Sequence, residues 1–555
     1  MEFVHGSYLH VNIYNPIYDY LDRLATQGVL PYYQNNTLPL KREYIANILI
    51  NLNNQRDKLS RVDQKLLDEY LVDYRYELTD MQYFKLVNGE TTYHPFSSWS
   101  NMTRGARDVF LYTEKQENHH IVVYEKDRNL IWMDIGGMAR YEINNSHNRL
   151  PYSYHYNLSV LLGDHFIVYS DADLYSILHD AGFYGEYPQE YKGGSSANHE
   201  GFFGFDYEQV FEYANAYVQY SSNIGHISLA SEPLLWGNAR YPIILSDNVP
   251  PFPMISWDKR LGNSSFSFFH GTILPAEPKG QDDAGLISFA SKYLVGHRWE
   301  ISITDKLNGA FTEMLVYGGR DPELVYFIPT IFLLPVQQSN TTSQAADNIL
   351  WFIEAEYFPV SGLKLYSTFI IDELRVSEIF NDWDGNRWGL QGGTHIAGEL
   401  FTYPTDLRIE FTAIHPWTYT HRVPLYGTYT HHGRSLGFEH GPNSQLLLME
   451  NRWWVNTRNR FSISYEQLKW GEEPEEDKND EYHFGNNPND NYILANPDYE
   501  YQTGWIIGDI QITHTIKLLW EYQLSNIIGL KMGFLHKKGT DKSENMMSIQ
   551  VNMDY

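Results

Sequence analysis

The sequence predicts a mainly β protein, in which a transmembrane antiparallel β-barrel follows a small N-terminal helical bundle. Three observations predict this fold class. Aromatic residues make up 15% of the chain, with 44 Tyr and 14 Trp, although the mean hydropathy is −0.44. After about residue 80, apolar and polar residues alternate with a period of two. The alternating segments are joined by a short turn and a long connection in regular succession, which is typical of barrels in outer membranes.

The composition limits the possible partners. The chain has 555 residues, no Cys and a formal net charge of −28. Without Cys it has no disulfides and no thiolate metal ligands. The negative charge argues against nucleic acid and against a polybasic contact with anionic lipid. We expect no nucleic-acid partner and no cofactor.

The sequence shows neither a membrane-spanning helix nor a signal peptide. The most apolar run, 327–336, contains two Pro. It is also shorter than the ~18 residues that such a helix needs. The first four residues lack the basic and apolar regions of a signal peptide. We therefore expect the outer membrane of a Gram-negative cell, reached with a leader that was removed or replaced; a cytosolic protein is the alternative.

The N-terminal segment predicts three amphipathic helices. The first is expected to begin at Asn15 and to end before Gly28, which are common start and stop signals. The second begins near Lys41. The third begins at Ser60, which opens a Ser-x-x-Asp capping box. Three such helices make a small bundle, so we predict a helical periplasmic domain over 1–80.

The remainder, 81–555, predicts the strands of the barrel. The last ten residues show this best, because apolar and polar positions alternate from Met547 to Tyr555. Because successive side chains of a strand point to opposite faces, one face is apolar and the other polar. The same pattern occurs at 299–303, 351–357, 407–411 and 506–524. At about 25 residues per strand and loop, the segment holds about 16–20 strands.

The connections distinguish a barrel from a soluble all-β protein, which would show the same alternation. Short turns are expected at 305–308, 359–362, 404–406, 457–459 and 525–526. Longer connections are expected at 318–348, 373–393, 414–445, 471–504 and 537–545. Outer-membrane barrels have short periplasmic turns and long extracellular loops, so we favour the barrel.

Short segments along most of the chain form an ordered series: 15–21, 37–40, 235–237, 246–248, 250–253, 296–300, 315–319, 363–366 and 441–444. This series resembles the capsule-assembly Wzi-like family of outer-membrane proteins. The region 82–200 matches least, and the acidic stretch 472–481 is particular to this chain.

The resemblance implies a barrel of about 18 strands above a periplasmic helical bundle. It also implies a protein that binds or organises capsular polysaccharide at the cell surface. The expected partners are the lipid bilayer, the lipopolysaccharide of the outer membrane and a surface polysaccharide. The alternative function is a porin or uptake channel. A binding protein requires a blocked barrel, and the segments that would plug it are 242–253, 327–336 and the N-terminal helices.

Charged side chains at alternate strand positions are predicted to line the lumen. They could bind sugar or filter solutes. We favour a structural role, in which opposite charges pair across the interior and hold the wall. These residues are Arg298, Glu300, Glu354, Glu356, Arg408 and Glu410.

The long connections carry the candidate polysaccharide-binding residues. Flat aromatic faces can stack on sugar rings, and Arg pairs with the carboxylates of acidic polymers. The alternative for such aromatic residues is an interfacial belt or packing within the wall. The candidates are Arg387, Trp388, Trp417, Tyr429 and Arg434.

Metal binding stays open at this stage. The stretch 382–386 begins like a calcium loop, but position 12 of that loop is Gly393 instead of Glu, so it is not an EF-hand. The acidic run 472–481 is typical of a solvated loop. Adjacent His residues, as in His431 and His432, point to opposite faces of a strand and do not chelate one ion. We find no motif of an enzyme, and we expect that the protein is not an enzyme.

Overall fold

The fold was analysed in a computed structural model of the chain. The structure describes residues 8–78, 120–126, 129–144, 147–180, 196–197, 207–278, 280–281, 287–339, 347–373, 385–400, 402–473, 483–492, 504–540 and 542–554. Within these ranges, no helix combines the length and the apolar character that crossing a membrane requires.

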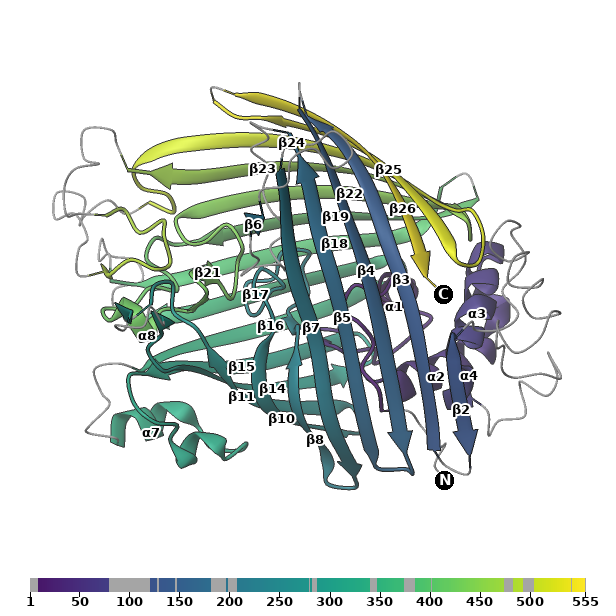
Figure 1. The fold of residues 1–555 in the computed structure, drawn as a ribbon, viewed down its shortest axis with the longest axis horizontal. Coiled ribbons are helices and arrows are strands. Elements are labelled where there is room, and N and C mark those ends of the chain that lie inside the picture. The colour runs from purple at the N-terminus through teal and green to yellow at the C-terminus, as the bar shows by residue number, and fades with distance from the viewer. Residues whose placement is uncertain are drawn as a thin grey trace.

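A closed antiparallel barrel of 18 strands forms most of the molecule (Figure 1). Each strand pairs with the next along the chain, and the last strand, β26, closes the barrel against β3. The strands are β3 Asn129–Asn144, β4 His147–Leu162, β5 Phe166–His179, β7 Tyr207–Ser222, β8 Gly225–Glu232, β10 Phe252–Leu261, β11 Ser264–Ile273, β14 Lys292–Thr304, β15 Leu307–Gly318, β16 Asn348–Val360, β17 Leu363–Glu373, β18 Arg387–Leu400, β19 Tyr403–Ile414, β22 Ser444–Asn456, β23 Asn459–Glu472, β24 Asp509–Gln523, β25 Ile528–Lys538 and β26 Ser543–Asp554. The predicted fold class is confirmed.

Short strands complete the described sheets. The strand β2 pairs with β3 beyond the point where β26 ends, so β2 and β26 share one edge of β3. The pairing of β1 with β9 joins the N-terminal segment to a stretch that lies inside the barrel. The short strands are β1 Thr37–Leu38, β2 Val122–Lys126, β6 Ser196–Ala197, β9 Leu235–Trp236, β12 Gly280–Gln281, β13 Ile287–Ser288, β20 Thr430–His431 and β21 Arg434–Ser435.

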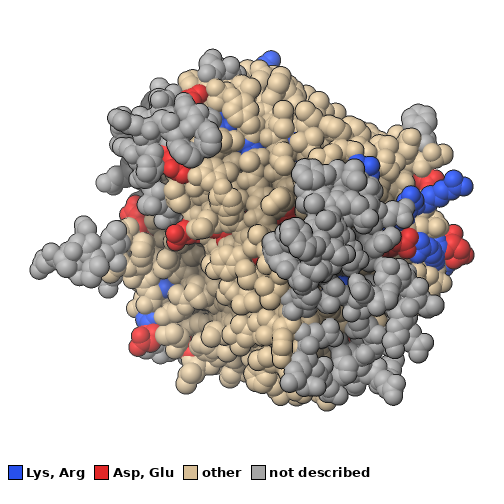
Figure 2. Space-filling view, turned by 45° about the vertical axis from the view of Figure 1, so that its right-hand side comes forward, with Lys and Arg blue, Asp and Glu red and all other residues tan. Residues whose placement is uncertain are grey.

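The wall alternates between an exposed apolar face and a buried polar face. On β16, Ile353 is 52% exposed and its neighbour Glu354 is only 4% exposed. On β14, Trp299 is exposed between the buried side chains of Arg298 and Glu300. Figure 2 shows the consequence, because most of the described surface in that view carries no charged side chain. An uncharged outer face of this kind suits contact with lipid.

The two ends of the barrel differ in their connections. At one end, strands are joined by short turns, such as those between β14 and β15 and between β16 and β17. At the other end lie long connections, including 233–251, 319–347 and 415–443. The turn expected at 404–406 was wrong, because β18 ends at Leu400 and β19 begins at Tyr403. A proline near the start of a strand is tolerated there, so Pro404 does not mark a turn.

The N-terminal helices begin close to their expected positions. They are α1 Ile17–Thr26, α2 Arg42–Asn53, the 3-10 turn η1 Arg56–Lys58, α3 Arg61–Asp73 and α4 Arg75–Leu78. The Ser60 hydroxyl accepts a hydrogen bond from the backbone N–H of Asp63, as the capping box predicted. Gly28, which follows α1, has a φ of 80°, a conformation that glycine adopts without strain. The helices share an apolar core and gather at one end of the barrel (Figure 1). The predicted boundary between 1–80 and 81–555 lies outside the described residues.

The apolar run 327–336 does not plug the barrel, so that expectation was wrong. It belongs to a connection that contains η4 Leu324–Phe327 and α7 Leu333–Ser339. Tyr326 and Leu333 pack against wall residues in a cluster that is separate from the interior core. In Figure 1, α7 lies outside the barrel. The outer wall is apolar too, and it therefore offers such a segment the same burial as the interior.

Candidate functional site: the filled barrel interior and its rim

The chain between β8 and β10 turns into the barrel. Residues 233–251, which we call the plug segment, contain a run of buried apolar side chains at Ile243, Ile244 and Leu245. The backbone N–H of Trp236 donates to the carbonyl of Leu245 at 2.8 Å, which folds the segment back on itself. The prediction that the Pro-rich stretch 242–253 enters the barrel agrees with this path up to the start of β10.

A second connection, 415–443, packs on the plug segment. The Tyr419 hydroxyl donates to the carbonyl of Ile243 at 2.8 Å, and the Tyr429 hydroxyl donates to the carbonyl of Ile244 at 2.7 Å. The backbone N–H of Ser246 donates to the carbonyl of Leu436 at 2.8 Å. Together these apolar side chains join wall residues in one continuous cluster. Buried carbonyls of an irregular segment are costly unless they are bonded, so these tyrosines fix the path of the plug segment.

Arg240 connects the plug segment to the wall and to α1. Its guanidinium donates to Asp19 at 2.8 Å and to Glu450 at 2.9 Å. Its backbone N–H points to the Glu410 carboxylate, with a shortest distance of 3.0 Å. Arg452 also pairs with Asp19 and Glu450. One arginine of the plug segment therefore holds three elements together through charged hydrogen bonds.

Helix α1 is fixed in the mouth of the barrel by Asp22. The carboxylate accepts from Lys364 at 2.6 Å and pairs with Arg408, and both cations belong to the wall. Burial alone would raise the pKa of Asp22, but these cations outweigh it and hold the pKa well below its usual range. Asp19 behaves likewise, since Arg240 and Arg452 outweigh its burial and lower its pKa. Both carboxylates are therefore charged when the helix is docked.

The predicted lumen residues are all buried, and they bond to one another, to other residues of the wall or to the inserted segments. Arg298 pairs with Glu354 and donates to the Thr37 hydroxyl at 2.6 Å, while that hydroxyl donates to Glu300 at 2.8 Å. Glu356 accepts from Asn308 at 3.1 Å. Arg408 and Glu410 bond to Asp22 and to Arg240, as described above. These buried ion pairs and hydrogen bonds therefore suit a structural role, in which they hold the wall and the inserted segments together.

Sequence reasoning missed the residues that make these connections. Arg240 and Asp22 stand in no motif, and Asp22 lies 386 positions from its partner Arg408. Asp19 lies in the segment 15–21, but nothing in that segment indicates its partners. The only local signal was the presence of two Asp in the first turns of a helix whose other face is apolar.

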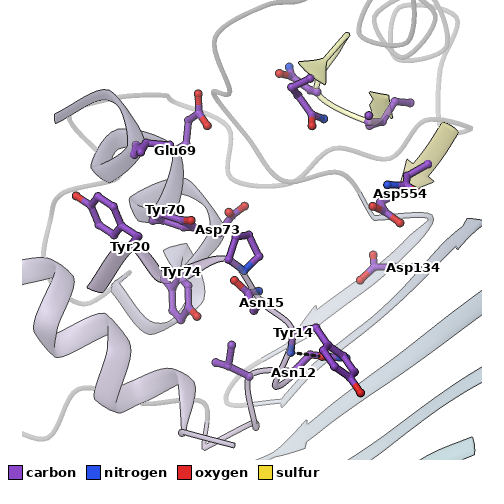
Figure 3. A pocket seen from close by; sticks show the side chains of 18 of the residues that line it. Asn12, Tyr14, Asn15, Tyr20, Glu69, Tyr70, Asp73, Tyr74, Asp134 and Asp554 are labelled. Atoms are coloured by element: carbon purple, nitrogen blue, oxygen red, sulfur yellow. Dashed lines mark hydrogen bonds between the residues drawn. The ribbon is translucent and has the colours of Figure 1, made fainter. Parts of the chain in front are cut away.

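A cavity of about 810 Å³ lies between the helices and the neighbouring strand ends of β22–β26 and β3–β5. Figure 3 shows tyrosine rings and carboxylates from the helices on one side of it. Asp134 of β3 and Asp554 of β26 lie across from them. The N-terminal segment contributes Tyr14, whose backbone N–H donates to Asn12 at 2.9 Å. The lining comes from distant parts of the chain, so no sequence pattern predicts it.

The candidate sugar-binding residues fall into two groups. Trp417 and Tyr429 are both buried. The Tyr429 hydroxyl bonds to the plug segment, while the backbone N–H of Trp417 donates to the carbonyl of Gly485, in the connection between β23 and β24, at 3.0 Å. Arg387, Trp388 and Arg434 are partly exposed. The Arg387 guanidinium lies 3.7 Å from the centre of the Tyr492 ring, and Trp388 packs edge-on against Trp505 at 4.5 Å. The tertiary structure therefore separates residues that the sequence placed together.

Among the described residues, one group has the composition of a metal site. Glu473, His483 and Asp490 offer ligand atoms within 4.8 Å of one another, all in the connection between β23 and β24. His483 already bonds to Glu473 at 2.8 Å. The earlier calcium-like stretch 382–386 lies largely outside the described residues, as does most of 472–481. His431 is buried in the barrel and accepts from the backbone N–H of Leu274 at 2.9 Å.

Comparison with known proteins finds similarity to solved structures. No protein-family profile and no curated protein matches the chain. The structure of Wzi, described as an outer-membrane protein involved in group 1 capsule assembly in Escherichia coli and as a carbohydrate-binding β-barrel, matches with a TM-score of 0.57. That match covers 98% of both chains at 13% identity.

Two Pseudomonas aeruginosa structures match over a smaller part of the chain. OprD matches with a TM-score of 0.40 and 11% identity, over 77% of this chain and 95% of its own. OpdK, solved with vanillate, matches with a TM-score of 0.43 and 7% identity, over 77% of this chain and 98% of its own. The match to Wzi covers 98% of this chain and therefore includes both the barrel and the N-terminal helices. This chain therefore has the Wzi-like outer-membrane β-barrel fold, a closed antiparallel barrel of 18 strands.

Proposed function

We propose that the chain is a Gram-negative outer-membrane protein that binds or organises a surface polysaccharide. In this proposal the barrel is a scaffold, the binding surface is formed by the long connections, and no reaction is catalysed. The partners are the lipid bilayer and lipopolysaccharide around the wall, and the polysaccharide above it. Binding residues on long loops of a rigid scaffold are a common arrangement.

The filled interior is the observation that carries this proposal. The plug segment is held by buried tyrosines, by the ion pairs of Arg240 and by the docked helix α1. Moving it aside would expose buried apolar side chains and separate charged partners. A channel needs a lumen lined by water, and these contacts instead favour a barrel that does not conduct.

Two further facts support a polysaccharide as the ligand. The structural neighbour Wzi is described as a carbohydrate-binding barrel in capsule assembly. At the end with the long connections, Arg387 and Trp388 begin strand β18 and Arg434 lies in the connection 415–443, all three in partly exposed positions. The predicted connection 373–393 is therefore shorter than expected, because its last residues belong to β18. The net charge of −28 opposes an acidic polymer, so such a polymer would bind through local arginines or bridging divalent ions.

Loop variants in the native host test the proposal. The connection 415–443 also holds the plug segment, so the test does not shorten it. Instead, Arg387, Trp388 and Arg434 are replaced together by Ala. We expect less cell-attached and more shed polysaccharide, with barrel levels unchanged. Unchanged attachment, combined with a large steady conductance of the purified chain in planar bilayers, would favour the porin or uptake channel instead.

A further inference from the structure

Residues 320–339, in the connection between β15 and β16, lie on the outer face of the barrel. Strand β15 shows this, because Met314 and Val316 belong to the interior core while Leu315 and Tyr317 belong to a separate cluster. Tyr326 and Leu333 complete that second cluster from the connection. We call residues 320–339 the outer flap. Figure 1 shows its helix α7 beside the barrel and apart from its interior.

Specific contacts fix the outer flap on the wall. The backbone N–H of Leu333 donates to Glu313 at 2.9 Å, and the Trp351 indole donates to the same carboxylate at 3.0 Å. The Phe327 ring stacks on His270 with 4.0 Å between centres. Glu313 and His270 lie on the outward face of their strands and are nonetheless buried. The flap therefore covers polar groups of the wall that would be costly against lipid.

The opposite face of the outer flap is apolar and uncovered. Leu324 is 85% exposed and Phe332 is 71% exposed, and Ile328 lies between them in the chain and is exposed as well. From residue 324 to residue 339 the sequence contains no charged side chain. An exposed apolar patch of this kind needs a partner, because leaving it in water is unfavourable.

The surroundings of the flap identify that partner. Its exposed face continues the apolar outer face of the same strands, where Trp299, Ile303 and Ile353 are exposed. The flap joins β15 to β16 at the end of the barrel that carries the long connections, and the N-terminal helices lie at the opposite end. With 7 residues, α7 is far too short to cross a bilayer and can only lie along it.

We propose that the outer flap is embedded in the outer leaflet of the membrane, with Leu324, Ile328 and Phe332 in contact with acyl chains. The flap widens the lipid-contacting surface of the barrel on the side of β11, β14 and β15, and it seals the polar groups beneath. The inference rests on the membrane location proposed above. Its occupant is lipid, and neither a second copy of the chain nor water covers this face.

Site-directed spin labelling tests the inference in the full chain. The chain has no Cys, so single variants Phe332→Cys and Leu324→Cys can each be labelled at one site. Both side chains are mostly exposed, so either substitution removes little packing. The labelled chains are reconstituted in phosphatidylcholine vesicles, and collision of the nitroxide with oxygen and with a water-soluble nickel chelate is measured.

Two matched positions calibrate the measurement. Ile353→Cys reports the outer wall, and Lys542→Cys reports an exposed position in the connection between β25 and β26. We expect both flap labels to behave as Ile353→Cys does, with frequent oxygen and rare nickel collisions. Nickel collisions as frequent as at Lys542→Cys would place the flap in water and overturn the inference.

Each remaining outcome is also decisive. Labels at the flap that meet neither reagent would show a protein partner or a second copy on this face, which overturns the inference in favour of that interface. If Ile353→Cys itself meets the nickel chelate, the membrane location fails, and that result is distinct from a failure of the flap alone.

Discussion

At the scale of single residues, a few buried charges decide how the N-terminal helices attach to the barrel. Asp22 is the centre of one such group, with Lys364 and Arg408 on the wall. Replacing Asp22 by Asn would leave both cations buried without their carboxylate. Breaking a buried pair in this way costs about 3–5 kcal/mol.

We therefore expect Asp22→Asn to release the helical segment from the barrel at lower denaturant concentration than the native chain. Limited proteolysis of the folded barrel along a urea series measures this release. The matched control is Asp68→Asn, which breaks the pair of Asp68 with Arg56, where the Asp68 side chain is 49% exposed. The control should cost about 0–1 kcal/mol. Equal effects of the two variants would contradict the role assigned to Asp22.

The same charges predict a dependence on pH. The pKa values of Asp19 and Asp22 are lower in the folded chain than their ordinary values, because the wall cations outweigh burial. Their stabilising contribution is therefore complete above about pH 4, the usual range of an unfolded Asp, and is lost as the pH falls further. We expect proteolytic release of the helices to increase between about pH 4 and pH 2. In Asp22→Asn the acid-dependent part should be smaller, and an identical pH profile would argue against this linkage.

At the scale of elements, the two faces of each strand differ in what they tolerate. On β24, Ile516 is 38% exposed on the outer wall, while Thr515 is 7% exposed and pairs in register with Glu466. An arginine on the lipid face costs about 2–4 kcal/mol near the bilayer midplane. At position 515 it would point inward beside a carboxylate.

We expect Ile516→Arg to be clearly more destabilising than Thr515→Arg when both chains are refolded into lipid vesicles along a urea titration. The two substitutions add the same side chain one position apart, so each serves as the control of the other. Equal midpoints for the two variants would show that the inner and outer faces are assigned incorrectly.

The plug segment is the element on which the proposed function depends. Arg240 gives it charged hydrogen bonds to Asp19 and Glu450. Hydrogen bonds to charged groups contribute about 1.5–3 kcal/mol each. Since 1.4 kcal/mol corresponds to about a tenfold change in an equilibrium, transient opening should become at least about tenfold more frequent in Arg240→Ala.

Single-channel recording in planar bilayers measures this change. The native chain should show rare openings, and Arg240→Ala should show brief openings at higher frequency. Arg56→Ala is the control, because Arg56 lies in the helical segment away from the plug segment and pairs at the surface with Asp68. A native chain that conducts steadily would refute the blocked interior.

At the scale of the whole molecule, the barrel brings together segments that are far apart in sequence. The N-terminal helix, the plug segment and the connection 415–443 meet inside one closed wall. The wall is rigid because every barrel strand is hydrogen-bonded on both sides, so the inserted segments have fixed partners. The proposed binding surface lies on the long connections, at the end of the barrel opposite the N-terminal helices. Loops on such a rigid wall can vary in sequence without loss of the fold.

Several features of this fold could be predicted from local sequence. The alternation on β16 and β24 places Ile353 and Ile516 on one face and their neighbours on the other, because side chains of a strand alternate by geometry. The cap at Ser60 is likewise local, because the hydroxyl reaches an N–H only three residues away. These patterns sufficed for the barrel and for the starts of the helices.

Other features were decided only by the tertiary structure. The sequence predicted that both 242–253 and 327–336 would plug the barrel, but only the fold placed the first inside the wall and the second outside. Tyr429 looked accessible on a long loop, and the fold buried it against the plug segment. The physical reason is that hydrophobic burial has no direction, so an apolar segment gains as much against the outer wall as within the core. Polar partners make the choice. For the flap the partner is Glu313, on the strand that leads into it, and for the plug segment it is Glu450, which only the folded barrel brings into reach.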